Sequence, residues 1–354
     1  MNIKMMNLIC REAVMSNNKT DNLNKAKKAR NDEFYTQYSD IEKEMQAYLE
    51  FNEDVFRGKS IFMPCDDPDY SDFTKHFTQN FERYGIKKLI STSYVSNGRG
   101  KIFSMVQGSD EHQTLDVEKS RWSYLDGDGD FRSNEINDIA KSCDIIITNP
   151  PFSMFQDFLI WVVGLGKEFS VIGSMNAITY KHVFPLIRDN KLWLGFGSKN
   201  GGNSVWFKLP QNAALNKHEK LINGIRIFPV SSKWYTNIEH GRRNEPLQLM
   251  TMKDNLTYNK KVIKNKGTIN TIYQKYDNYD AIEVSYTDAI PSDYDGVMGV
   301  PISFLDKYNP NQFEILGCNR GVNQEDTGTY GRGTYINGKE VFKRIFIQHK
   351  RSVT

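Results

Sequence analysis

The feature that most constrains the fold is an alternation of short apolar runs with amphipathic runs between residues 41 and 187. Helical spacing of the apolar residues predicts helices at 41–51, 71–84, 133–141, 153–165 and 180–187. The apolar runs between them predict buried strands at Lys59–Cys65, Lys88–Tyr94, Asp144–Thr148 and Phe169–Gly173. Strands that alternate with helices predict an α/β fold with a doubly wound, mostly parallel sheet. Such sheets bind ligands beyond the carboxyl ends of their strands.

The rest of the chain is less regular. Residues 95–119 are polar and contain glycine, which predicts a long loop before a short strand at Trp122–Leu125. After about residue 190, short β-like runs are broken by Gly and Asn, at 192–196, 205–209 and 225–230. We therefore expect an α/β domain over 31–190 and a smaller β-rich region over 191–354.

The first 30 residues carry seven Lys and Arg against two acidic residues and show little helical periodicity. This composition predicts a flexible basic tail over residues 1–30. Met15 is a plausible alternative start to Met1.

The net charge of +3 hides a separation of charge along the chain. The first 177 residues hold 21 basic and 27 acidic side chains, and the remainder holds 25 and 16. Within the basic half, residues 199–275 hold 14 basic and four acidic side chains. A solvated surface or a site for a polyanion would each explain this block.

Several classes of protein are excluded by composition. The longest apolar run, Phe158–Gly166, has nine residues, well short of the roughly 20 that cross a membrane. The four cysteines are widely spaced and form no CxxC pair, which disfavours disulfides and structural zinc and favours a cytoplasmic location. An EF-hand loop beginning at Asp126 would need Gly and Glu where Phe131 and Asn137 stand, so we expect no bound metal.

The sharpest motif is Asn149-Pro150-Pro151-Phe152, directly after the strand Asp144–Thr148. The Asn149 side chain offers a carbonyl acceptor, and Pro150 lacks an N–H and presents a carbonyl on a fixed backbone. Pro151 stiffens the turn, and Phe152 adds an aromatic face. Two acceptors beside a flat ring suit a planar heterocycle with an amino group. Accepting both amino hydrogens draws the nitrogen lone pair towards an activated electrophile, so catalysis needs positioning more than a strong base. A Pro-Pro pair alone would only end a strand.

This motif resembles that of S-adenosylmethionine-dependent amino-methyltransferases, above all the DNA adenine-N6 enzymes. An ordered set of further segments resembles the EcoRI-type adenine methyltransferase family over nearly the whole chain from residue 25. These segments are 31–44, 65–68, 127–133, 148–153, 176–180, 191–195 and 234–237. Two departures from the wider superfamily stand out. Cys65-Asp66-Asp67-Pro68 stands where the superfamily has a glycine-rich loop after its first strand. The second strand ends in Ser93-Tyr94, without the acidic residue that usually holds the cofactor ribose.

The resemblance implies a Rossmann-like methyltransferase domain over 31–190 that binds S-adenosyl-L-methionine. It implies that Asn149, Pro150, Pro151 and Phe152 are catalytic. It also implies cofactor contacts, with Asp130 accepting from the adenine amine of the cofactor, Phe131 against its ring, and Tyr35 and Thr36 at its methionine end. The full set of implied cofactor residues is Tyr35, Thr36, Cys65, Asp66, Asp130 and Phe131.

We expect residues 191–354 to recognise double-stranded DNA, with Asn237, Arg242 and Arg243 as candidate contacts. For each single residue, a solvated surface is the alternative, and Trp206 and Trp234 suit a core. The predicted activity is methylation of an adenine flipped out of the duplex, within restriction–modification or as an orphan methylase. GAATTC is suggested as the site only by analogy. A cognate restriction endonuclease would act on the same site without a stable complex, and we expect a monomer.

Two other functions remain open from the sequence. RNA adenine and a protein glutamine amide also present an amino group to related motifs. A catalytically silent DNA-binding protein is the alternative from another class.

Overall fold

The computed structural model describes residues 35–108, 122–196, 204–208, 220–222, 225–264, 268–319 and 333–350. The predicted flexible tail over 1–30 lies outside these residues.

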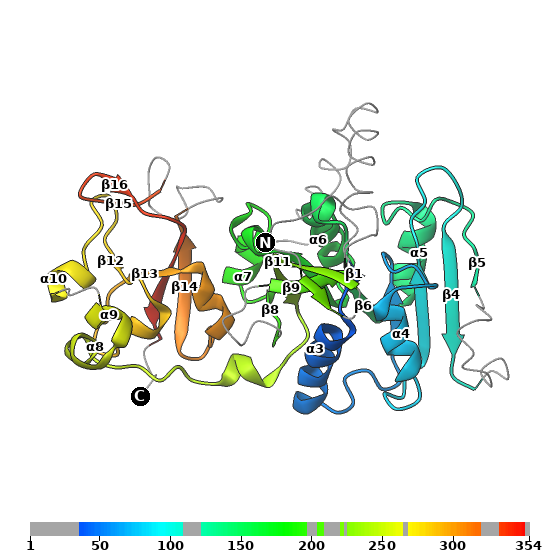
Figure 1. Ribbon diagram of the computed structural model, residues 1–354, viewed down its shortest axis with the longest axis horizontal. Helices are drawn as coiled ribbons and strands as arrows, with labels where there is room; N and C mark the ends of the chain where they lie inside the picture. Colours follow the sequence, from blue (N-terminus) through cyan, green and yellow to red (C-terminus); the bar gives the residue numbers. More distant parts are fainter. Residues whose placement is uncertain are drawn as a thin grey trace. The chain divides into compact units, whose positions relative to one another are not determined.

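The chain divides into two compact units, and Figure 1 labels helices and strands of both. The large-sheet unit comprises Met1–Met175 and Leu194–His240. The small-sheet unit comprises Asn176–Trp193 and Gly241–Thr354.

The centre of the large sheet consists of four parallel strands in the order β3-β2-β6-β7. In register, Ile61 of β2 faces Leu89 of β3 on one side and Ile145 of β6 on the other. Their apolar, β-branched side chains are almost entirely buried, as expected for parallel strands covered on both faces. The strands are β2 (Ser60–Met63), β3 (Lys88–Thr92), β6 (Ile145–Thr148) and β7 (Glu168–Ser174).

Antiparallel strands flank this centre on both sides, so the sheet is mixed. The expectation of a mostly parallel sheet is therefore right only for the four central strands. The flanking strands are β4 (Lys101–Val106) and β5 (Trp122–Tyr124) beside β3, then β11 (Ile225–Thr236), β9 (Ser204–Lys208) and β1 (Tyr35–Thr36) beside β7. Two further strands, β8 (Trp193–Leu194) and β10 (Lys220–Ile222), pair with β11.

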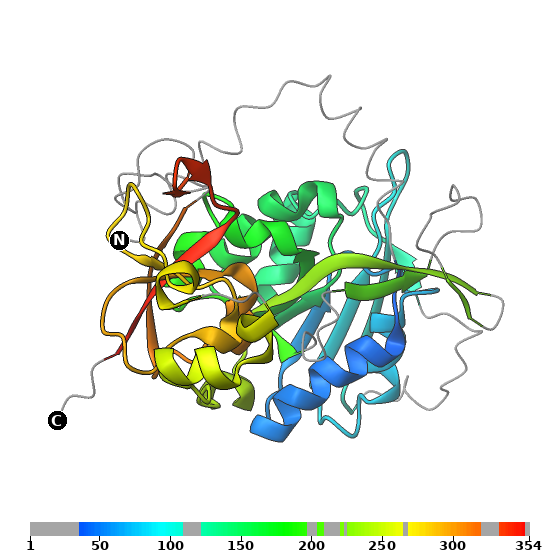
Figure 2. The same ribbon diagram turned by 60° about the vertical axis from the view of Figure 1, so that its left-hand side comes forward.

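Two sequence expectations fail at these flanks. The segment predicted as a loop over 95–119 contains β4, whose partly exposed residues lack the apolar run of a buried strand. The strands β9 and β11 belong to the large sheet, although residues after 190 were expected in a separate region. The strand β11 continues beyond the predicted run at 225–230 and ends at Thr236. Figure 2 shows it as one long strand.

Helices connect the central strands. Ser71 and Ser133 cap α4 and α5, each accepting from backbone amides of the first turn. Apolar residues of α3 and α4 form one core with β2, β6 and β11, including the fully buried Trp234. The helices are α3 (Tyr38–Phe51), α4 (Asp72–Gln79), α5 (Asn134–Ser142) and α6 (Phe155–Gly164).

The small-sheet unit contains a four-stranded sheet in the order β12-β13-β17-β14. Its strands are β12 (Ile282–Glu283), β13 (Met298–Pro301), β14 (Phe313–Cys318) and β17 (Arg344–His349), with a hairpin of β15 (Tyr335–Ile336) and β16 (Lys339–Glu340). Its helices are α7 (Phe184–Arg188), α8 (Met252–Tyr258), α9 (Lys260–Lys264) and α10 (Ile269–Ile272).

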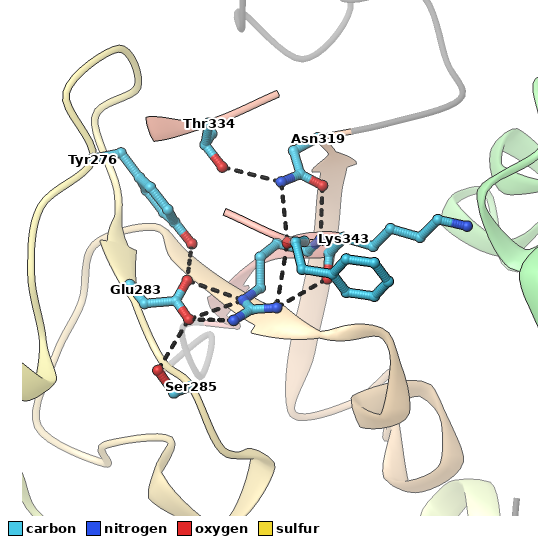
Figure 3. A network of polar contacts seen from close by, with 8 residues as sticks. Tyr276, Glu283, Ser285, Asn319, Thr334 and Lys343 are labelled. Atoms are coloured by element: carbon cyan, nitrogen blue, oxygen red, sulfur yellow. Dashed lines mark hydrogen bonds and ion pairs between the residues drawn. The ribbon is translucent and has the colours of Figure 1, made fainter. Parts of the chain in front are cut away.

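A polar network joins two strands of this small sheet (Figure 3). Arg344 at the start of β17 donates to both carboxylate oxygens of Glu283 in β12, at 2.6–3.0 Å. The Tyr276 hydroxyl also donates to Glu283, at 2.5 Å. The side chains of Glu283 and Arg344 are only 8% and 14% exposed, so the network forms a buried ion pair.

Among the residues that the structure describes, no helix has the length and apolar character needed to cross a membrane.

Candidate active site at the carboxyl ends of β2 and β6

The motif Asn149–Phe152 joins β6 directly to a helical segment. Its first residue follows Thr148, the last residue of β6, and its last begins a 3₁₀ turn (Phe152–Met154) that leads into α6. The Pro151 carbonyl accepts from the Met154 amide at 3.0 Å, which fixes the turn. Pro150 is buried, while Asn149, Pro151 and Phe152 are half-buried. The motif therefore stands at the carboxyl edge of the parallel strands, where the sequence predicted chemistry.

Asp66 connects the loop after β2 to this motif. The Ser71 hydroxyl donates to Asp66 Oδ1 at 2.7 Å, and the Thr148 hydroxyl donates to Oδ2 at 2.5 Å. The backbone amide of Asn149 also hydrogen bonds to the carboxyl group. The same Thr148 oxygen accepts from the Cys65 amide at 3.2 Å. The loop after β2 and the start of the motif are thus held together by side chains.

Burial raises the pKa of Asp66 to about 7, because the carboxylate is almost fully removed from solvent. The hydrogen bonds from Thr148, Ser71 and Asn149 oppose this rise, and the charge of Asp67 adds to it. The carboxyl group therefore changes its charge near neutral pH.

The end of β3 packs closely against the loop 126–130. The Val95 amide donates to the Asp128 carbonyl at 2.8 Å. Gly129 has a φ of +84°, and a Cβ atom there would lie 2.1 Å from the Ser93 carbonyl oxygen. Only glycine fits this close approach, so the loop that holds Asp130 is fixed beside the carboxyl end of β3.

Asp130 and Phe131 are both in contact with protein groups. The Asp130 carboxylate accepts from the Arg132 backbone amide and guanidinium, each at 2.9 Å, and forms an ion pair with it. Phe131 is 5% exposed, and its ring meets Phe158 and Trp161 with centroids 5.1 Å and 5.5 Å apart. Their contacts with a cofactor stay predictions.

The segment before α3 holds two buried polar atoms. Thr36 Oγ1 and Gln37 Nε2 meet no hydrogen-bond partner among the described residues. Since buried polar groups are nearly always hydrogen bonded, these two atoms suit a bound polar ligand. Tyr35 forms β1 with Thr36, where Thr36 pairs with Phe207 of β9.

Comparison with known proteins gives the family. The family described as adenine-specific methyltransferase EcoRI matches residues 22–350. The chain belongs to this family. It is therefore an adenine-specific methyltransferase, as the sequence predicted.

Curated relatives cover almost the whole of this methyltransferase. The Type II methyltransferase M.EcoRI of Escherichia coli is 41% identical over 95% of this chain and 99% of its own length. M.MgeORF184P of Mycoplasma genitalium is 34% identical, and M.MpnI of Mycoplasma pneumoniae is 32% identical. Each of these two covers 93% of this chain and 98% of its own length. No solved structure matches the chain.

The three candidate DNA contacts of this methyltransferase lie in different surroundings. Both ends of the Asn237 side chain bind main chain, since Oδ1 accepts from the Phe169 amide at 2.7 Å and Nδ2 donates to the Lys167 carbonyl at 2.9 Å. Arg243 is 4% exposed, with its guanidinium 3.7 Å from the ring centroid of Trp193. Arg242 is half-buried. Asn237 and Arg243 therefore have structural contacts, and a role of all three in DNA binding stays a prediction.

Sequence reasoning missed Ser71 and Thr148 as members of the site. A signal was present for each, because Ser71 precedes an amphipathic helix and Thr148 is the hydroxyl residue that ends an Ile run. Among the described residues, no group of three or more His, Cys, Asp and Glu side chains is placed to hold a metal ion.

Proposed function

We propose that this enzyme transfers a methyl group from S-adenosyl-L-methionine to N6 of an adenine that is flipped out of duplex DNA. The observation that carries the proposal is the position of Asn149-Pro150-Pro151-Phe152, at the carboxyl end of β6 in a member of an adenine-specific family.

The roles proposed for the motif follow from its chemistry. The Asn149 side-chain oxygen and the Pro150 carbonyl accept the two hydrogens of the adenine amine, and Phe152 stacks on the base. The two acceptors direct the nitrogen lone pair away from the ring and towards the methyl donor. The rigid proline pair and the 3₁₀ turn keep these groups in one arrangement before the base arrives, so little reorganisation is needed at the moment of transfer.

The cofactor that the family implies would supply an electrophilic sulfonium methyl group. The buried polar atoms Thr36 Oγ1 and Gln37 Nε2 fit such a ligand, because each could then gain a hydrogen-bond partner. We propose that Tyr35 and Thr36 hold its methionine end, that Cys65 and Asp66 border its site, and that Asp130 and Phe131 receive its adenine. Asp130 would accept the amine while it keeps its ion pair with Arg132.

We further propose that the large sheet is a doubly wound, Rossmann-like methyltransferase sheet. The chain passes from β2 to β3 on one side and returns to β6 on the other side of β2, with α4, α5 and α6 in the connections. A ligand site is expected at such a reversal, between the carboxyl ends of β2 and β6.

We propose that the region 191–354 provides most of the contacts to DNA. Support comes from the basic block at 199–275 and from α9, where Lys260 and Lys264 are exposed. Replacing both by alanine should weaken DNA binding for every sequence and reduce the slope of log affinity against log salt by about two, since each lost phosphate contact contributes about 0.9. The matched control is Lys43→Ala with Lys141→Ala, which removes the same charge from exposed positions of the large-sheet unit. An equal slope in both double variants would remove α9 from the DNA surface.

The relatives are named Type II methyltransferases. We accordingly propose a monomeric enzyme whose mark protects sites from a cognate endonuclease without a stable complex between them.

The decisive experiment incubates the protein and labelled S-adenosylmethionine with duplex DNA, RNA or a mixture of proteins. The proposal predicts label in DNA, recovered as N6-methyladenine. Label in RNA or in glutamine would replace the substrate, and no label in any of the three would indicate a catalytically silent DNA-binding protein.

A further inference from the structure

We infer that Asp66 is a positioning residue for methyl transfer, whose carboxylate orients Asn149 through the Asn149 backbone amide and the Thr148 hydroxyl. This inference rests on the proposed function, because it assigns a role within that reaction. It replaces the cofactor contact that the family resemblance implies for the same side chain.

The first step of the argument is that Asp66 is itself held in place by β3. Its backbone amide donates to the Thr92 carbonyl at 3.0 Å, and its carbonyl accepts from the Ser91 hydroxyl. The Ser71 hydroxyl, which also caps α4, then fixes one carboxylate oxygen at 2.7 Å. A carboxylate with this many anchors is a rigid reference point for whatever else binds it.

The second step is that the Asp66 carboxylate also binds the end of β6 and the first residue of the motif. Thr148 Oγ1 donates to Asp66 Oδ2 at 2.5 Å, and the next residue donates its backbone amide to the same carboxyl group. An amide bond is planar, so fixing the Asn149 N–H fixes the plane from which its side chain departs.

The third step is that Asp66 has little capacity left for a ligand. Only 4% of the residue is exposed, and both carboxylate oxygens already accept hydrogen bonds from protein donors. Because so little of the residue is exposed, the carboxylate offers a cofactor little access from solvent.

The ionised form of Asp66 matches this arrangement, since all three groups donate to it. A proton on the carboxyl group would remove the negative charge that strengthens these hydrogen bonds, and so weaken its contacts with Thr148 and Asn149. The groups that hydrogen bond to Asp66 are neutral, among the described residues of β3, β6 and the N-terminus of α4. Asp67 is a charged neighbour of Asp66, and its Oδ1 lies 3.5 Å from Lys101 Nζ. The rate of methyl transfer should therefore fall as the pH drops through about 7, where Asp66 takes up a proton.

The chain offers a matched control at the other end of the same two strands. Asp144 Oδ2 accepts from the Ser60 amide at 2.8 Å, so this carboxylate also links β6 to β2. It lies at the amino ends of the strands and is exposed. Asp144→Asn thus repeats the chemistry of Asp66→Asn away from the motif.

The test measures single-turnover methyl transfer to DNA at saturating cofactor, together with cofactor affinity by calorimetry. Asp66→Asn and Thr148→Val should each lower the rate by about 10–100-fold, the range expected from a small misplacement of reacting groups. Cofactor affinity should stay within about threefold in both, and the double variant should be no slower than the slower single one, because the two side chains share one contact. Thr148→Ser should recover most of the rate, and Asp144→Asn should match the parent enzyme. The fall in rate below pH 7 should be absent in Asp66→Asn.

A large loss of cofactor affinity in Asp66→Asn, with the parent rate at saturation, would overturn the inference and make Asp66 a cofactor ligand. A parent rate that stays constant from pH 8 to pH 6 would also overturn it. If Asp66→Asn does not fold, as judged by circular dichroism, the comparison of Thr148→Val with Thr148→Ser decides, and equal rates in those two would overturn it. A parent enzyme that methylates no DNA would contradict the proposed function instead, and the pH titration of the Asn149 amide resonance would then test the contact with Asp66 on its own.

Discussion

Each unit of this methyltransferase contains a buried carboxylate at the centre of a polar network, and the two networks differ in their donors. Glu283 in the small-sheet unit meets the guanidinium of Arg344 and the hydroxyl of Tyr276. Asp66 in the large-sheet unit meets two hydroxyls and one backbone amide, and the described residues bring no cation to it. Because the donors to Asp66 are neutral, its burial is not offset by a cation and raises its pKa.

This difference indicates a structural role for the Glu283 network and a role in the candidate active site for the Asp66 network. The Glu283–Arg344 pair joins two strands and has no motif beside it, while Asp66 contacts the residue proposed to bind the substrate amine. A buried carboxylate whose pKa lies near 7 and which contacts the motif supports an active site at the carboxyl ends of β2 and β6.

The largest effect on stability should come from breaking the Glu283–Arg344 pair. Arg344→Met leaves Glu283 as a buried charge without its cation, which costs about 3–5 kcal/mol in the free energy of unfolding. The double variant Glu283→Leu with Arg344→Met removes both charges and should be far less destabilised. Urea unfolding of the two variants measures this, and equal losses in both would show that packing, and not the buried charge, is responsible.

Asp66→Asn should change how stability depends on pH. The pKa of Asp66 is raised in the folded protein to about 7 from an ordinary value of 3.8, so its ionisation costs the folded state free energy. Its contribution to stability is fully present below pH 3.8 and is lost as the pH rises through 7. The stability of the parent relative to Asp66→Asn should therefore increase as the pH is lowered from 7 towards 4. Urea midpoints at several pH values measure the difference, and a difference independent of pH would place Asp66 in a more solvated setting.

The smallest effect should come from Asp144→Asn. The new side chain keeps an acceptor for the Ser60 amide, and the site is exposed, so the loss should stay below about 1 kcal/mol. The rate of methyl transfer should be unchanged. A rate as low as that of Asp66→Asn would mean that any link between β2 and β6 affects the motif, and the contrast between the two ends of the strands would disappear.

The central strands were predictable from sequence because their signal is local. Ile145–Thr148 is an uninterrupted β-branched run, and Ser133 stands in a capping position before an amphipathic segment. The motif Asn149–Phe152, for which we propose a catalytic role, could be found for the same reason, since its four residues are contiguous.

The remaining features depend on contacts between distant residues. The strand β4 is only partly buried, and the connection from β3 at 93–100 contains glycines, so the local pattern of this segment resembles a loop. Asp66 meets Thr148 across 82 positions, so spacing could not show that its carboxylate faces the motif. Arg243 was predicted at a basic surface, but its stacking on Trp193 buries it, and charge counts carry no such information.

The measurement that tests the central claim most directly is single-turnover methyl transfer by Asn149→Ala, with DNA affinity measured in parallel. The account predicts that the rate falls by at least about 10²–10³-fold, since a preorganised acceptor for the adenine amine is lost, while DNA affinity is retained. Formation of N6-methyladenine at the parent rate would contradict it.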